Sequence, residues 1–251
     1  MIVYGRNPVA EALRGRRAGT VQEIWAVAGA LREPWLARAQ AGGMRVHRAS
    51  PADIERHCGA AAHQGVCALV GPYPYASDQE LLGQPEALLV ALDQVQDPQN
   101  LGSICRTAEC AGANGVVIGE RRAAAVTPAV CKASAGAVEH LPVAQVRNVA
   151  DFLAQARAAG LWCYGASPRG RAGQPEPVPY DAPDYRGSGL VLVLGGEAKG
   201  LRPRVAGACD QLICLPLRGR SESLGVAAAA AALLYGILQR RGEGVDTGSK
   251  L

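Results

Sequence analysis

Residues 87–240 alternate short apolar segments with helical stretches, and this alternation constrains the fold more than any other feature. Each apolar segment is nearly continuous, which is typical of strands buried on both faces of a parallel sheet. The segments are ALLVALD (87–93), GVVIG (115–119), a stretch near 141–146, LWCYGA (161–166), LVLVLG (190–195) and ICLPL (213–217). Helical patterns lie at 101–111, after Pro128, at 149–159 and at 224–239. The sequence therefore predicts an α/β domain with a parallel sheet.

A second, smaller domain is expected before this sheet. Residues 21–70 alternate short apolar runs with two helical stretches, at 31–41 and 51–57, which predicts a small α/β/α unit. The segment GPYPYASDQELLGQPE (71–86) contains three prolines and shows no sustained period. We expect domains at 1–72 and 87–243, a linker at 73–86 and a flexible tail at 244–251. A long loop is expected at 165–189.

Composition narrows the class of protein. Apolar residues make up 49% of the chain, so a core can be buried. No apolar run approaches the roughly 20 residues of a membrane span, and the first residues lack a signal-peptide pattern, so we expect a cytoplasmic protein without a membrane partner. The eight cysteines are scattered without a CxxC pair. Buried thiols are the favoured interpretation and a zinc site the alternative, so no metal is expected.

The net charge of +4 is unevenly distributed. Residues 1–72 contain nine Lys and Arg against five Asp and Glu, whereas residues 73–251 contain seventeen of each. A basic first domain favours contact with a polyanion. A solvated surface would explain the same small excess.

The loops after the sheet strands are where ligands bind in parallel α/β folds. The common nucleotide signatures are missing there. No strand leads into a G-x-G-x-x-G turn, and Gly195 to Gly200 has phosphate-loop spacing but is followed by Leu201. A dinucleotide or ATP enzyme is therefore disfavoured.

Three of these loops contain unusual polar residues. Asn100 and Arg106 lie in a helix that Asp97-Pro98 would introduce, Glu197 follows a pair of glycines, and Ser221 or Ser223 could cap the last helix. Each has a purely structural explanation when taken alone. Taken together, these residues form an ordered set of three motifs, each in a loop that follows a strand of the sheet.

That pattern resembles the three motifs of the SpoU (TrmH) branch of the SPOUT RNA methyltransferases. NLGSICRTA (100–108) matches N-x-G-x-I-x-R-T-A, and LVLGGEAKGL (192–201) matches the second motif. LPLRGRSESLGVAAA (215–229) fits the third except that Gly225 replaces the usual Asn and Ala227 a frequent Ser. YGRNPVAEALRG (4–15) and HQGVCALV (63–70) resemble the family's ribosomal-protein-like substrate-binding domain.

The resemblance implies a deep trefoil knot at the C-terminal end of the parallel sheet, S-adenosylmethionine as cofactor, and a homodimer formed through the knotted domain. It places Gly195, Leu215 and Leu224 against the donor's adenosine, largely through backbone groups. The alanine run 227–232 would then permit close helix approach between subunits, although an ordinary buried helix would also explain it.

The resemblance also implies catalytic roles. Arg106 is the family's catalytic position, and because a guanidinium keeps its proton we expect it to clamp an RNA phosphate and orient the 2′-hydroxyl. Asn100 would support the same ribose or phosphate, Glu197 would fix Arg106 or its loop, and Ser223 would hold the third motif. In the first domain, the residues expected to bind RNA are Arg6, Asn7, Arg14, Arg16, Arg17 and Gln64.

The expected substrate is a guanosine ribose in 23S rRNA, since the two-domain arrangement resembles the branch that methylates large-subunit rRNA. DNA is not an expected partner. Two alternatives remain open: a tRNA ribose methyltransferase of the same family, and a catalytically silent RNA-binding or ribosome-assembly factor. The replacement at Gly225 motivates the second alternative.

Overall fold

The chain forms two compact units in the computed structural model, which describes residues 1–170, 175–196, 199–220 and 223–242. The first unit contains Met1–Tyr75, Asp97–Glu109 and Ala124–Pro142. The second contains Ala76–Gln96, Cys110–Ala123 and the residues from Val143 onward. None of the described helices is both long enough and apolar enough to cross a membrane.

A four-stranded sheet in the order β1-β4-β2-β3 is the centre of the first unit. Strand β4 is antiparallel to β1 and β2, and β2 is parallel to β3. Along β2, Ile24 and Ala26 are buried while Glu23 and Trp25 are partly exposed, so only one face of this strand joins the core. The elements are β1 (Ile2–Tyr4), α1 (Arg6–Ala12), η1 (Ala18–Thr20), β2 (Glu23–Ala26), η2 (Ala30–Arg32), α2 (Pro34–Ala41), β3 (Arg45–Arg48), α3 (Pro51–Cys58), β4 (Val66–Leu69), α5 (Pro98–Cys110), α6 (Pro128–Ala133) and η3 (Ala137–Glu139).

A buried ion pair connects the start of the chain with η3. The Arg17 guanidinium donates to both carboxylate oxygens of Glu139, and the two side chains are 1% and 0% exposed. Burial acts to lower the pKa of Arg17, but the hydrogen bond and charge of Glu139 outweigh it and raise that pKa overall. The expectation that Arg17 contacts RNA phosphates is therefore wrong, because its charge is already satisfied inside the protein.

Seven parallel strands in the order β7-β6-β5-β10-β8-β11-β9 form the second unit. All six residues of β5 are buried, as its uninterrupted apolar sequence predicts. The strands are β5 (Leu88–Asp93), β6 (Gly115–Gly119), β7 (Val143–Val146), β8 (Trp162–Ala166), β9 (Val178–Pro179), β10 (Leu190–Gly195) and β11 (Gln211–Cys214). The helices are α4 (Asp78–Leu82), α7 (Val149–Ala158), α8 (Pro203–Ala206) and α9 (Val226–Arg241).

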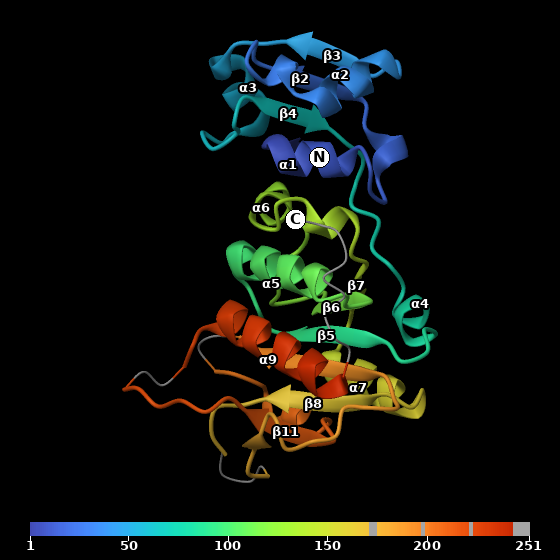
Figure 1. Cartoon of the computed structure of the whole chain (residues 1–251), viewed down its shortest axis with the longest axis vertical. Helices are drawn as coiled ribbons and strands as arrows, with labels where there is room; N and C mark the ends of the chain where they lie inside the picture. The colour runs from blue at the N-terminus through green and yellow to red at the C-terminus, as the bar shows by residue number, and fades with distance from the viewer. Residues whose placement is uncertain (171–174, 197–198, 221–222, 243–251) are drawn as a thin grey trace. The chain divides into compact units, whose positions relative to one another are not determined.

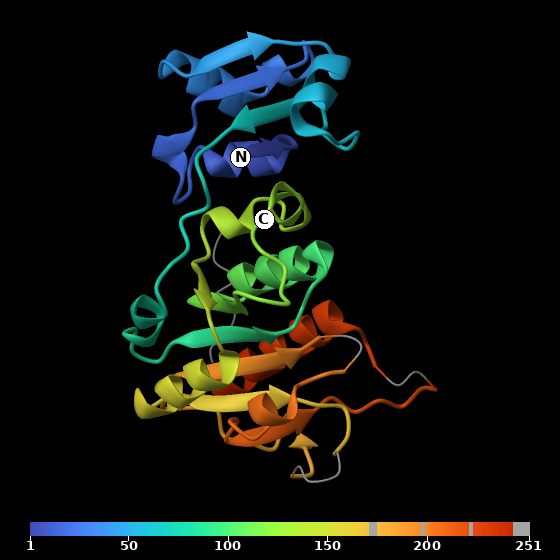
Figure 2. The ribbon, with the colours of Figure 1, turned by 180° about the vertical axis from the view of Figure 1, so that it is seen from behind.

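Helices cover both faces of this sheet. Figure 1 shows α9 in front of the strands, and Figure 2, the view from behind, shows α7 over the opposite face. On the α7 side, Leu89, Ala91, Val191 and Val193 belong to one buried cluster with Phe152 of α7. The predicted parallel α/β architecture is confirmed.

Three local features differ from the sequence prediction. Helix α4 lies inside the expected linker, where Ser77 accepts a hydrogen bond from the Glu80 amide and caps the helix. Strand β1 and helix α1 lie before residue 21, where the predicted pattern of the first domain begins. Elements of seven residues or fewer are too short to show a clear hydrophobic period, so the sequence did not predict these two. The cap of α9 is Gly225, with φ 76° and no side-chain hydrogen bond, so Ser223 does not cap the helix.

Candidate functional site

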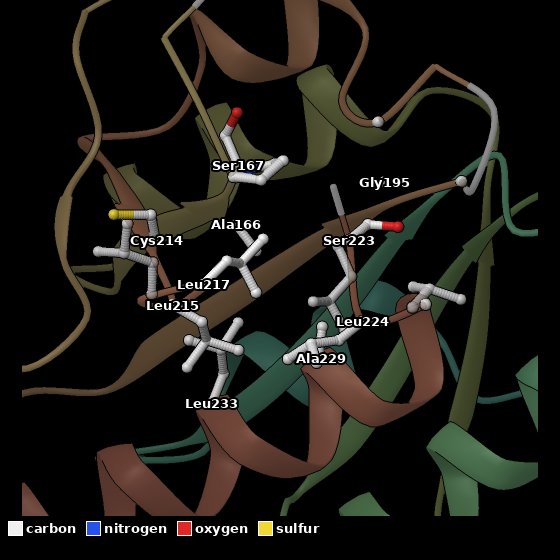
Figure 3. Close-up of a pocket in the computed structure, with 17 residues that line it drawn as sticks. Ala166, Ser167, Gly195, Cys214, Leu215, Leu217, Ser223, Leu224, Ala229 and Leu233 are labelled. Atoms are coloured by element: carbon white, nitrogen blue, oxygen red, sulfur yellow. The ribbon is translucent and has the colours of Figure 1, made fainter. Parts of the chain in front are cut away.

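A cavity of about 180 Å³ opens where strands β8, β10 and β11 end and α9 begins. Strands in parallel sheets end at a common edge, so these segments meet although they are far apart in the sequence. Figure 3 shows side chains from these segments around the cavity, with Ala229 and Leu233 on α9. Its lining consists of Ala166, Ser167, Pro168, Leu194, Gly195, Gly196, Gly200, Ile213, Cys214, Leu215, Leu217, Ser223, Leu224, Gly225, Val226, Ala229 and Leu233.

Gly195 and Gly196, at the end of β10, line the cavity with backbone atoms and no side chains. A Cβ on Gly195 would lie 2.1 Å from the carbonyl carbon of Gly200, and one on Gly196 would lie 2.4 Å from the Gln94 carbonyl oxygen. Both distances are shorter than any side chain allows. Glycine at these two positions therefore lets the chain fold back on itself, and leaves backbone atoms facing the cavity.

A buried carboxylate holds this wall in place. Asp93, at the end of β5, is 0% exposed and accepts hydrogen bonds from the Arg202 amide at 2.8 Å and the Arg202 Nε at 2.7 Å. Its carbonyl oxygen accepts from the Gly196 amide at 2.8 Å. The Asp93–Arg202 pair thus fixes both ends of the turn that follows β10. Sequence reasoning missed this pair, although Asp93 ends a strand at the ligand-binding edge.

The cavity is mostly apolar and partly uncovered. Leu217 and Leu224 are 37% and 52% exposed, which is unusual for leucines beside a cavity. A ligand with a flat aromatic ring and an aliphatic chain would cover them, while backbone amides and carbonyls nearby could recognise polar ring edges. The residues present therefore fit the adenosine and the aliphatic methionine chain of S-adenosylmethionine.

The structure brings together the residues predicted to bind the donor. Gly195, Leu215 and Leu224 all line this cavity, and so does Ser223. Ala166, Ser167 and Pro168 also line it, and sequence reasoning missed them because it assigned the residues after β8 to a long loop. Their only signal was the end of a strand at the same edge.

The other predicted catalytic residues are placed on α5 of the first unit. Asn100 is the third residue of that helix and partly buried, and Arg106 is exposed. The Gln99 amide donates to the Asp97 carboxylate at 2.9 Å, so Asp97 satisfies one of the free amides at the start of the helix. Glu197 lies outside the described residues.

The predicted RNA-binding residues of the first domain are exposed, apart from Arg17. Arg6 pairs with Glu33 at 2.8 Å and Arg14 with Glu11 at 2.9 Å. Both arginines are half exposed, so each pair is weak and can exchange for a phosphate. Gln64 accepts from the Arg6 amide.

The eight cysteines are all free thiols. Cys67, Cys105, Cys131 and Cys163 are buried, and burial raises the pKa of Cys105 and Cys131 to about 12. These thiols stay protonated at neutral pH. Within the described ranges, no three His, Cys, Asp or Glu side chains are grouped as metal ligands.

Comparisons with known protein families match almost the whole chain. Residues 87–235 match the SpoU rRNA Methylase family. Residues 2–76 match the RNA 2'-O ribose methyltransferase substrate binding domain. The two matched regions are adjacent and do not overlap.

Individual relatives agree with this assignment. The chain is 34% identical to a putative TrmH family tRNA/rRNA methyltransferase of Bacillus subtilis, covering 95% of each chain. An AdoMet-bound rRNA methyltransferase from Sinorhizobium meliloti has a TM-score of 0.77 and 28% identity, covering 95% of this chain and 86% of that one. A TrmH/SpoU tRNA modifying enzyme of A. aeolicus has a TM-score of 0.55 and 25% identity, covering 66% and 81%. The motifs, the parallel sheet and these matches together show that the chain belongs to the SpoU rRNA methylase family of RNA methyltransferases.

Proposed function

We propose that this protein transfers a methyl group from S-adenosylmethionine to a ribose 2′-hydroxyl of RNA, and that its target is a guanosine in 23S rRNA. The observation that carries the proposal is the glycine-walled cavity at the ends of β10 and β11, which contains every residue expected to bind the donor. Family membership supports the reaction class. A relative with 95% coverage of this chain is described as bound to AdoMet.

The donor would supply an electrophilic methyl group on its sulfonium. Gly195 and Leu215 would hold its adenosine, and Leu224 would close over it, because this leucine is half exposed in the structure. With the donor bound over Leu217 and Leu224, the apolar lining would exclude water from the reacting centre and so strengthen the electrostatic interactions there. Ser223 lines the same cavity and would contact the ribose or keep the turn before α9 in position.

Arg106 would position the acceptor. A guanidinium binds phosphate oxygens through two parallel hydrogen bonds, so it can fix the phosphate next to the target ribose and stabilise negative charge that develops on the 2′-oxygen. Asn100, on the same helix, would support that ribose or phosphate. Proton loss from the hydroxyl would accompany or follow methyl transfer.

The two-domain arrangement favours rRNA over tRNA. The rRNA methyltransferase neighbour covers 95% of this chain, whereas the tRNA-modifying neighbour covers 66%. The first domain matches a substrate-binding domain and holds the excess of positive charge. Together these observations support a large folded RNA, which in turn implies a cytoplasmic enzyme that has no membrane or DNA partner.

We also infer the family's homodimer and knotted C-terminal segment for this chain. Ala228, Ala232 and Tyr235 are exposed on α9 at the spacing i, i+4 and i+7, so they form one apolar stripe along the helix. The small alanine side chains would permit close approach of a second copy. Light scattering of the purified protein tests the dimer, since a monomer would contradict it.

The reaction is tested by incubating the protein with methyl-labelled S-adenosylmethionine and separate pools of unmodified rRNA and tRNA. We expect label in 23S rRNA, at one guanosine whose 3′ bond has become resistant to alkali. Incorporation into tRNA alone would overturn the substrate assignment. Donor binding without incorporation into any pool would support the silent assembly factor.

Substitution of Arg106 tests the proposed phosphate clamp most directly. Because the proposed clamp acts mainly in the transition state, Arg106→Ala should lower kcat by about 100-fold or more, while the Kd for the donor stays unchanged. Arg106→Lys keeps the charge but not the planar pair of donors, so an intermediate kcat is expected. Near-normal turnover of Arg106→Ala at saturating RNA would show that another residue positions the acceptor.

A further inference from the structure

A second cavity, of about 270 Å³, lies at the ends of β5, β6 and β7 and is lined by four arginines. Arg121 and Arg122 follow β6, Arg147 follows β7, and Arg202 follows the turn after β10. These residues come from three separate segments of the chain. Their convergence could not be seen in the sequence.

Three of the four charges are available to a ligand. The Arg202 guanidinium is paired with the buried Asp93 carboxylate at 2.7 Å. Arg121, Arg122 and Arg147 are exposed, and no carboxylate among the described residues pairs with them. Among the described residues of the lining, Asp93 is the only acidic one, and Arg202 neutralises it. The described lining therefore carries about three uncompensated positive charges.

Backbone geometry holds these arginines together. The Glu120 amide donates to the Val146 carbonyl at 2.9 Å, which fastens the end of β6 to the end of β7 and places Arg121 beside Arg147. Arg122 has φ 55° and Gln94, also in the lining, has φ 61°. Left-handed backbone at residues other than glycine is costly and is concentrated at functional sites. The turn after β6 is thus held in a strained form that keeps Arg122 at the cavity.

A helix start adds to the positive potential. Val149, the first residue of α7, lines the cavity, and Asn148 caps this helix by accepting from the Ala150 amide at 3.0 Å. The α7 helix has ten residues, so the partial positive charge of its N-terminus points at the same space as the arginines. Both features favour an anion.

The arginine cavity adjoins the proposed donor cavity. Asp93 pairs with Gly195 in the sheet register and accepts the Gly196 amide, and both glycines line the donor cavity. The Asp93–Gly196 contact therefore separates the two cavities. An anion held by the arginines would be close to the proposed donor cavity.

We propose that Arg121, Arg122 and Arg147 form a binding site for RNA backbone phosphates that flank the target ribose. The proposal rests on the proposed function and names how this unit holds its substrate. Arginine suits the role because its guanidinium matches the geometry of phosphate oxygens. Several guanidiniums from fixed strand ends would hold two or more consecutive phosphates and thereby set the position of the strand.

The test uses the full-length protein loaded with S-adenosylhomocysteine and an rRNA fragment that the wild-type protein methylates. The variants are Arg147→Gln, the pair Arg121→Gln and Arg122→Gln, and the combined triple substitution. The matched control is Arg186→Gln, which removes one charge from an exposed side chain that pairs with Asp184 and lines neither cavity. Fluorescence anisotropy gives the RNA Kd at several salt concentrations. Calorimetry on protein free of S-adenosylhomocysteine gives the donor Kd, and turnover with S-adenosylmethionine gives KM and kcat.

We expect Arg147→Gln to raise the RNA Kd about 5-fold and the triple variant about 50-fold or more near 0.1 M salt. The slope of log Kd against log salt should fall by about 0.7 to 0.9 for each phosphate contact removed. KM for RNA should rise more than kcat falls. Arg147→Lys should recover part of the affinity and Arg147→Glu should weaken binding further, while Arg186→Gln and every donor Kd stay within about 2-fold of wild type.

Each outcome distinguishes this proposal from the proposed function. If the wild-type protein methylates RNA but the triple variant binds it with unchanged Kd and salt slope, the phosphate site is wrong and the function stands. If the donor Kd rises and the RNA Kd does not, the cavity holds the donor's carboxylate, which also overturns the proposal. If the wild-type protein neither binds nor methylates RNA, both fail.

Discussion

Gly195 and Gly196 are the residues whose size matters most for the proposed donor cavity. Each lies where a neighbouring backbone segment occupies the position of a Cβ, Gly200 against Gly195 and Gln94 against Gly196. A side chain at either position would push apart the turn that Asp93 and Arg202 hold. The need for glycine follows from this close approach and not from a left-handed backbone.

Gly195→Ala should therefore raise the Kd for S-adenosylmethionine at least 10-fold and destabilise the protein by about 1–3 kcal/mol, the usual cost of overpacking. Titration calorimetry and urea unfolding measure the two effects. Gly219→Ala is the matched control, because a Cβ there meets no atom of the described residues within 4 Å. Donor binding by Gly195→Ala equal to that of Gly219→Ala would show that the cavity wall does not contact the donor.

Single residues show where sequence reasoning succeeds and where it stops. Gly195, Leu215 and Leu224 were assigned to one site through the resemblance to the family's second and third motifs, and the convergence of strand ends in a parallel sheet explains why they meet. Arg17 could not be assigned, since its burial depends on Glu139, 122 positions away. The sequence offered Ser221 or Ser223 as a cap for α9, but the chain turns at Gly225 with φ 76° and ψ 147°, a conformation almost restricted to glycine.

At the scale of elements, the contact between α5 and α6 positions the first motif. A Cβ on Gly102 of α5 would lie 2.4 Å from the Ala133 Cβ and 2.9 Å from the Ser134 amide nitrogen. Gly102 is completely enclosed in this contact and shares the helix with Asn100 and Arg106. The glycine of the first motif therefore sets how closely the helix that carries both side chains approaches its neighbour.

Gly102→Ala should destabilise the protein, although the same change inside an exposed helix stabilises by roughly 0.5–1 kcal/mol. Here the steric cost, about 1–3 kcal/mol, exceeds that gain. Thermal unfolding should show the loss, and kcat should fall because Arg106 moves with its helix. Ser103→Ala, one residue along, should leave both nearly unchanged, and a more stable Gly102→Ala would contradict the packing described.

The sequence predicts the elements of the second unit better than those of the first. Strands such as β5 and β10 can be recognised in the sequence from their continuous apolar residues. Helices α7 and α9 can be recognised because their helical patterns are long. Short elements cannot be recognised from the sequence in either unit. Strand β1 of the first unit has three residues, and α4 of the second unit lies in a proline-rich segment. Their existence depends on partners elsewhere in the fold.

At the scale of the molecule, the Arg17–Glu139 pair links the N-terminal sheet domain to a segment that follows β6 in the chain. The Arg16 amide also donates to the Glu139 carbonyl at 2.7 Å, and the Tyr73 hydroxyl donates to the Val138 carbonyl at 2.8 Å. Residues 1–75 and 124–142 consequently form part of one compact unit. No pattern within either segment indicates this long-range connection.

Glu139→Gln should lower the free energy of unfolding by about 3–5 kcal/mol, because it leaves a buried guanidinium without its counter-charge. Arg17→Met should cost a similar amount for the converse reason. The double variant should be much more stable than the sum of the two losses predicts, with a coupling of about 2 kcal/mol or more. Urea unfolding of the four proteins measures the cycle, and additive losses would show that the two charges do not stabilise each other.

The most direct test of the account is a crystal structure of the protein with S-adenosylhomocysteine and an rRNA fragment. We expect the adenosine to lie against Gly195, Leu215 and Leu224. The 2′-oxygen of the target guanosine should face the sulfur, and the Arg106 guanidinium should contact the adjoining phosphate. A nucleoside bound outside the cavity at the ends of β10 and β11, or a target ribose remote from Arg106, would contradict it.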